Sequence, residues 1–113
     1  MAESSIMASL MGVIAERKAR ASTESSYVAG LMKGGTAAIR AKIIEEAAEV
    51  VEASDEPGDA GRDHLVKEVA DLVFHAAVLL GYRDIGWDAV EAELGRRFGT
   101  SGLVEKASRP PTP

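Results

Sequence analysis

The sequence contains no cysteine, which excludes disulfide bonds and metal sites built from thiolates. Because this absence fits a reducing compartment, we expect a cytoplasmic location. Aromatic residues make up only 4% of the chain, so its core must consist mainly of Ala, Val, Leu and Ile. Basic residues number 13 against 18 acidic ones, and the net charge of −5 argues against a general nucleic-acid-binding surface.

The sequence also has little that suggests a membrane or a second domain. The uncharged segment from Leu72 to Tyr82 is shorter than the roughly 18 residues that a membrane span requires. Residues 1–5 lack the basic region of a signal peptide, so we expect neither a membrane anchor nor secretion. With 113 residues, the chain is expected to form one domain over residues 1–109, followed by a disordered, proline-rich end at residues 110–113.

Apolar residues recur at intervals of three and four along most of the chain, which is the period of an α-helix. We expect helices over residues 6–20, 27–32, 36–54, 59–80 and 87–98. Thr36 and Asp59 are the expected N-caps of the third and fourth helices. Between these two, the short loop from Asp55 to Gly58 makes them antiparallel neighbours. The sequence therefore predicts an all-α bundle of four to five helices.

Acidic residues occupy unusual positions in the third and fourth expected helices. Successive helical residues point about 100° apart, so Glu46 and Glu49 lie beside the apolar arc, with Glu46 nearest its border. In the following helix, Glu68 and Asp71 project from the apolar side itself. An unpaired carboxylate is costly to bury, and it is usually neutralised by a proton, a cationic side chain or a metal ion.

The two pairs of acids, each spaced three residues apart on its own helix, form a suitable oxygen cage for Mg²⁺. We therefore expect Glu46, Glu49, Glu68 and Asp71 to be metal ligands. The alternative is that Glu68 and Asp71 are buried acids neutralised by Lys or Arg. Spacing and polarity favour the metal site.

The same acids carry a resemblance to known proteins. Glu45-Glu46-Ala47-Ala48-Glu49, followed by Glu68-Val69-Ala70-Asp71, resembles the signature of the all-α nucleoside-triphosphate pyrophosphohydrolases. Further stretches, from Ser26-Tyr27 to Ser101–Arg109, resemble the phosphoribosyl-ATP pyrophosphohydrolase family of histidine biosynthesis. The resemblance implies Mg²⁺-dependent attack of water between the α- and β-phosphates of phosphoribosyl-ATP. The products would be phosphoribosyl-AMP and pyrophosphate.

The resemblance also implies roles for single residues. Glu45, Glu46 and Glu49 are the expected catalytic residues, although Glu45 points about 100° away from Glu46. Glu45 is therefore a general base, an outer partner of the metal ligands or a surface residue. From their charge and position, the expected substrate-binding residues are Lys33, Lys42, His75, Arg97 and Lys106, although Lys33, Arg97 and Lys106 taken singly are more often solvated surface charges. For Lys42 an ion pair with Glu46 is an equal alternative, and for His75 a hydrogen-bonded place in the core is favoured.

Two alternative functions share these features. A house-cleaning (d)NTP pyrophosphohydrolase would use the same acids, whereas a non-catalytic helical dimerisation module would use them to fix the pairing of helices. We expect a homodimer, because the helix from Leu65 to Leu80 is apolar almost all round and must be covered on every side. The favoured partner is the small molecule phosphoribosyl-ATP, with no nucleic acid and no membrane.

Overall fold

The structure is a computed structural model that describes residues 6–23 and 25–98. Its four helices are α1 (Ile6–Ala19), α2 (Tyr27–Ala53), α3 (Gly58–Tyr82) and α4 (Trp87–Phe98), and no strand occurs in the described ranges. The predicted all-α fold is confirmed. The predicted division into one domain and a disordered end stays a prediction, because residues 99–113 lie outside the described part.

Helix α2 consists of two pieces that meet at a kink. Its first turn is capped by Ser26, whose Oγ accepts a hydrogen bond from the Ala29 amide at 3.2 Å. At Gly35 the backbone leaves the helical region, with φ 72° and ψ −164°, a left-handed conformation that favours glycine. The sequence predicted two separate helices here. The structure confirms two helical pieces on either side of Gly35, joined at the kink, and the second piece ends at Ala53 with Ser54 as its C-cap.

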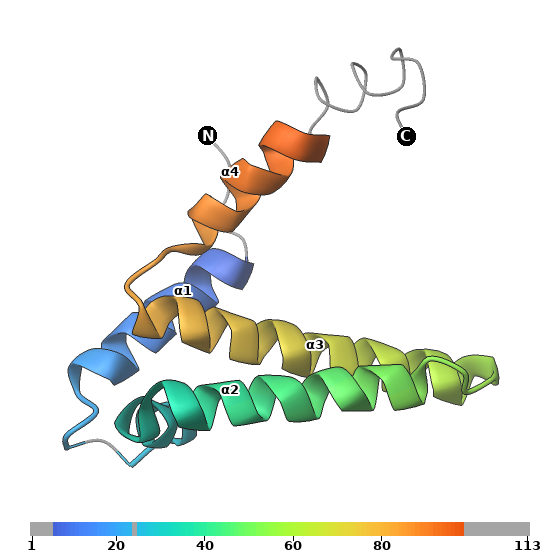
Figure 1. The fold of residues 1–113 in the computed structure, drawn as a ribbon, viewed down its shortest axis with the longest axis horizontal. Coiled ribbons are helices and arrows are strands. Elements are labelled where there is room, and N and C mark those ends of the chain that lie inside the picture. Colours follow the sequence, from blue (N-terminus) through green and yellow to red (C-terminus); the bar gives the residue numbers. More distant parts are fainter. Residues whose placement is uncertain (1–5, 24, 99–113) are drawn as a thin grey trace.

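Helices α2 and α3 form an antiparallel hairpin, which Figure 1 shows as two long neighbours joined by a short loop. The predicted cap at Asp59 is wrong. Pro57 takes the N-cap position without a side-chain bond, and Asp59 lies in the first turn of α3, where its charge still favours the helix dipole. Helix α3 also ends at Tyr82, two residues beyond the expected Leu80.

The buried core lies where α1, the start of α2 and the C-terminal half of α3 meet. Its members are Ile14, Val28, Leu31, Met32, Ile39, Ala77 and Val78. At the end of α3, the Lys18 Nζ of α1 donates to the Tyr82 carbonyl at 2.8 Å and to Asp84 Oδ1 at 2.9 Å. The core therefore occupies the end of the hairpin that lies away from its loop.

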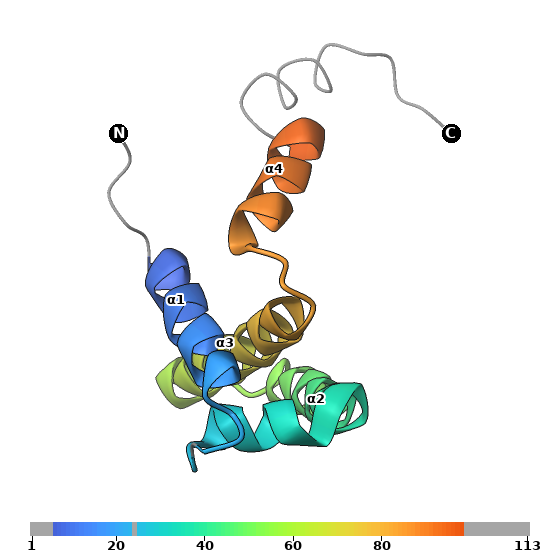
Figure 2. The ribbon, with the colours of Figure 1, turned by 90° about the vertical axis from the view of Figure 1, so that its left-hand side faces the viewer.

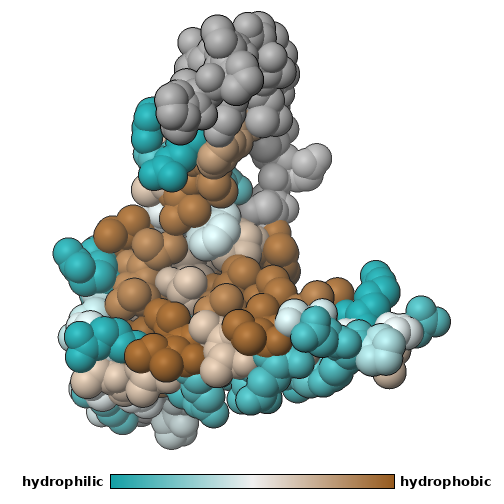
Figure 3. Space-filling view, turned by 45° about the vertical axis from the view of Figure 1, so that its right-hand side comes forward, coloured by the Kyte–Doolittle hydropathy of each residue, from teal (hydrophilic) through white to brown (hydrophobic). Residues whose placement is uncertain are grey.

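Much apolar surface stays uncovered in the single chain. Helix α4 has no buried residue and packs mainly on α1, and Figures 1 and 2 show it projecting away from α2 and α3. Ile44 and Val51 on α2 are each 70% exposed, and Val66 on α3 is 55% exposed. Figure 3 shows hydrophobic side chains gathered on one face of the molecule. Among the described residues, no helix combines the length and apolarity needed to cross a lipid bilayer.

Candidate active site

Three of the predicted metal ligands come together between α2 and α3. One oxygen each of Glu46, Glu68 and Asp71 can be chosen so that all lie within 4.8 Å of one another. Glu46 and Glu68 are only 6% and 4% exposed, and Asp71 is half-buried. The antiparallel hairpin produces this arrangement, because it places one turn of α2 opposite the two acids of α3, which are spaced three residues apart. These three residues are called the acid cage below.

The acid cage contains buried oxygens without partners. Within the described chain, Glu46 Oε1 and Glu68 Oε1 are buried and have no hydrogen-bond donor. The predicted alternative was that a Lys or Arg neutralises these acids. Lys67 is a candidate, but it is exposed and its Nζ lies 4.0 Å from Glu68 Oε2. Carboxylate oxygens left without donors in a buried site are costly. They suit a hard divalent cation, so the residues present fit Mg²⁺.

Glu49, the fourth predicted ligand, lies beside the acid cage and contacts Glu68. Two ionised carboxylates offer only acceptors, so a proton on Glu49 is needed to make this contact a hydrogen bond. The bond to Glu68, then burial and the negative charge of Glu46, raise the pKa of Glu49 from 4.5 to about 7. The same bond lowers the pKa of Glu68. Glu49 must release this proton before it can bind a metal ion, and its role as a ligand stays a prediction.

The raised pKa of Glu49 predicts how the metal-free protein responds to pH. The folded-state pKa of about 7 lies above the ordinary value of 4.5, so the protonated carboxyl stabilises the fold. This contribution is complete below about pH 4.5 and is lost as the pH rises through about 7. In EDTA, the Tm measured by circular dichroism should therefore fall between about pH 5 and about pH 8.

Glu49→Gln is the control for this pH effect, because it keeps the shape of the side chain and removes the titration. The fall in Tm should be smaller in the variant. Part of it will remain, since a hydrogen bond to Glu56 raises the pKa of His64, which acts in the same direction. Equal falls in the two proteins would show that Glu49 does not hold the proton.

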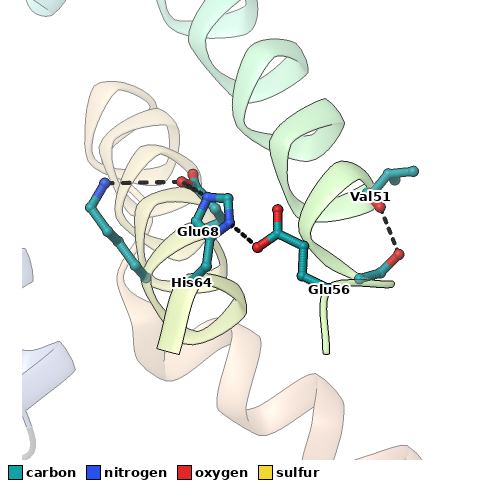
Figure 4. A network of polar contacts seen from close by, with 6 residues as sticks. Val51, Glu56, His64 and Glu68 are labelled. Carbon is teal, nitrogen blue, oxygen red and sulfur yellow. Dashed lines mark hydrogen bonds and ion pairs between the residues drawn. The ribbon is translucent and has the colours of Figure 1, made fainter. Parts of the chain in front are cut away.

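A histidine that was not predicted from the sequence joins Glu68 of the acid cage to Glu56 outside it. His64 Nδ1 lies 2.8 Å from Glu56 Oε1, and His64 Nε2 lies 3.1 Å from Glu68 Oε2. Figure 4 shows the ring of His64 between the two carboxylates. The spacing of four residues between His64 and Glu68 was a signal in the sequence. The contact with Glu56 could not be predicted in this way, because it depends on the conformation of the loop that closes the hairpin.

His75 supports the main chain of Asp71 from within the core. Its Nδ1 lies 2.8 Å from the Asp71 carbonyl oxygen and must carry the proton, since a carbonyl only accepts. The Tyr27 hydroxyl then donates to Nε2 at 2.7 Å. The ring is 5% exposed, and both of its nitrogens are used. This is the hydrogen-bonded core histidine that the sequence analysis favoured, and its predicted contact with substrate stays a prediction.

Comparison with known proteins gives this arrangement a family. The family model described as phosphoribosyl-ATP pyrophosphohydrolase matches residues 7–98 of the chain. The chain belongs to the phosphoribosyl-ATP pyrophosphohydrolase family. A protein of Rhodopirellula baltica named phosphoribosyl-ATP pyrophosphatase is 60% identical over 87 residues, covering 77% of this chain and 72% of its own.

Two further relatives extend the match along the chain. A phosphoribosyl-ATP pyrophosphatase of Geobacter metallireducens is 53% identical and covers 93% of both chains. One of Neisseria meningitidis is 47% identical and covers 93% of this chain and 94% of its own. The similarity therefore includes α1, the hairpin with the acid cage, and α4. The resemblance found in the sequence is confirmed.

In this pyrophosphohydrolase, Lys42 and Glu45 form an ion pair on α2. Lys42 Nζ contacts Glu45 Oε1 at 2.9 Å, so the expected ion pair with Glu46 is wrong. This hydrogen bond raises the pKa of Lys42. The helical wheel could not separate the two acids, because side-chain rotamers decide which one Lys42 reaches. Glu45 is turned outward, with its side chain 53% exposed, and its catalytic role stays a prediction.

The remaining predicted substrate-binding residues are not brought to the acid cage within one pyrophosphohydrolase chain. Lys33 is exposed and lies before the kink of α2, whereas Glu46 lies in the helical piece after it. Arg97 lies on α4, which follows the C-terminal end of α3 and projects away from the hairpin in Figure 1. There its Nε contacts Glu93 Oε2 at 2.6 Å. Lys106 lies outside the described residues.

Proposed function

We propose that the chain hydrolyses phosphoribosyl-ATP to phosphoribosyl-AMP and pyrophosphate, in the second step of histidine biosynthesis, at the acid cage. The observation that carries the proposal is the pair of buried oxygens without donors, Glu46 Oε1 and Glu68 Oε1, beside Asp71. Membership of the family supplies the substrate and the reaction. We also propose a cytoplasmic enzyme, as a biosynthetic role and the absence of cysteine suggest.

The side chains of the proposed active site have separate roles. Glu46, Glu68 and Asp71 would hold Mg²⁺, which neutralises phosphate charge and lowers the pKa of bound water. Glu49, beside Glu68, would accept the proton of the attacking water. Lys42 binds a phosphate oxygen of the substrate and keeps its contact with Glu45. The buried position of the cage limits competition from bulk water.

The test is release of pyrophosphate from phosphoribosyl-ATP by the purified full chain, with Mg²⁺ and with excess EDTA. We expect release that depends on Mg²⁺ and yields one pyrophosphate for each phosphoribosyl-AMP. Release of inorganic phosphate alone would contradict cleavage between the α- and β-phosphates. No hydrolysis of any nucleotide would favour the alternative of a non-catalytic dimerisation module.

We further propose that the enzyme is a homodimer. The supporting observation is the exposed apolar surface of the single chain, to which Ile44, Val51 and Val66 contribute. Burying such side chains contributes about 25 cal/mol per Å². A second copy would cover them at the same time on both chains, as closed two-fold symmetry requires. Light scattering at micromolar concentration should give twice the mass of one chain, and a monomer mass would contradict the proposal.

A further inference from the structure

The Glu68 carboxylate has one oxygen held and the other left without a donor. Its Oε2 accepts a hydrogen bond from His64 Nε2 at 3.1 Å, whereas its Oε1 is buried and has no donor. A carboxylate on a flexible side chain can rotate and offer either oxygen. A donor fixed on Oε2 restricts this rotation and leaves Oε1, which is buried without a donor, available to a cation.

His64 is itself held in place from the loop. Glu56 Oε1 lies 2.8 Å from its Nδ1, on the side of the ring opposite to Glu68. Glu56 follows the end of α2, so the bridge joins the loop of the hairpin to a residue inside the cage. Both nitrogens of His64 face carboxylate oxygens, which only accept, so the ring acts through two hydrogen bonds. Its effect on a bound cation is therefore mainly one of orientation.

We propose that His64, held by Glu56, is a positioning residue that fixes Glu68 for binding of the divalent cation. This inference rests on the proposed function, because it assumes that the acid cage binds the metal. Hydrogen bonds that orient a metal ligand typically change metal affinity by about 10- to 100-fold when they are removed. His64 does not touch the reacting atoms, so its effect should appear already in the absence of substrate.

The experiment measures binding of Mn²⁺, used as a stand-in for Mg²⁺, to the substrate-free full chain. The electron paramagnetic resonance signal of free Mn²⁺ gives the dissociation constant. His64→Ala should weaken binding by at least about tenfold. His64→Gln places an amide N–H near the position of Nε2 without a charge, and it should bind within about threefold of the wild type.

Arg62→Ala is the matched control. It removes an exposed positive charge at the start of α3, where Arg62 pairs with Asp63 and does not contact Glu68. This variant should bind Mn²⁺ as the wild type does. Circular dichroism checks that each variant is folded. If His64→Ala fails to fold, Glu56→Ala takes its place, because it frees the other side of the ring and should weaken binding several-fold, whereas Glu56→Gln keeps the acceptor and should not.

The outcomes separate this inference from the proposed function. Mn²⁺ binding by His64→Ala that equals or exceeds wild-type binding would overturn the positioning role, because the histidine would then be neutral or competing with the metal. Equal weakening in His64→Ala and His64→Gln would also overturn it, since the N–H donor would not be the cause. Absence of Mn²⁺ binding in the wild type would instead refute the metal site of the proposed function.

Discussion

Asp71→Asn is expected to lower kcat/KM for phosphoribosyl-ATP by about a thousandfold or more while helix content stays the same. A metal ion contributes several kcal/mol of charge stabilisation to reactions of this kind, and each 1.36 kcal/mol corresponds to about tenfold in rate. The amide keeps the shape of Asp71 but loses the charge that the cation requires. The fold should tolerate the change, because His75 contacts the main-chain oxygen of Asp71 and not its carboxylate.

The measurement is pyrophosphate release at saturating Mg²⁺, with circular dichroism as the check on folding. Glu49→Gln should cause a comparable loss, since it removes both the predicted ligand and the proton acceptor. Glu52→Gln is the matched control. Glu52 is an exposed carboxylate on the same helix and outside the cage, so its variant should retain wild-type activity. Near wild-type rates for Asp71→Asn or Glu49→Gln would mean that the cage is assigned to the wrong acids.

The enzyme is also expected to prefer phosphoribosyl-ATP over ATP by about two to four orders of magnitude in kcat/KM. The acid cage and its metal recognise a triphosphate, which both compounds have. Phosphoribosyl-ATP differs by a second ribose phosphate on the adenine ring. A charge-assisted contact to such a phosphate contributes roughly 1.5–3 kcal/mol, and two contacts realised in the transition state give this range.

The measurement compares kcat/KM for phosphoribosyl-ATP, ATP, dCTP and dUTP under the same conditions. Comparable values would contradict the histidine-pathway role and favour the house-cleaning alternative. In a dimer, the cations for the second phosphate would come from either chain. Lys33→Ala and Arg97→Ala should therefore reduce the preference for phosphoribosyl-ATP and leave the slow hydrolysis of ATP unchanged.

The helices, and the acids that form the cage, could be predicted from the sequence. Helical periodicity and the spacing of three residues are local properties, so α4 was predicted with its observed bounds and Glu68 and Asp71 were placed on one face. The two helical pieces on either side of Gly35 were also predicted, because Gly34-Gly35 interrupts a helical period that resumes at Thr36.

Contacts that depend on rotamers or on loop geometry could not be predicted. The partner of Lys42 is Glu45 because of side-chain rotamers that no helical wheel contains. The bridge through His64 requires Glu56 to approach across the loop of the hairpin. The direction of α4 depends on the short connector after Tyr82, where Asp84 has a positive φ of 60°, and periodicity carries no information about it.

The position of the acid cage within the hairpin bears on how the chain folds. Contacts beside a short loop usually form first, because little chain entropy is lost in closing it. Further from the loop, continued pairing of the two helices brings Glu46 toward Glu68 and Asp71, whose carboxylates repel one another when no cation is present. This repulsion opposes zippering of the hairpin past the cage until a cation is bound. The concentration of divalent cations would then affect how fast the hairpin closes, as well as what it catalyses.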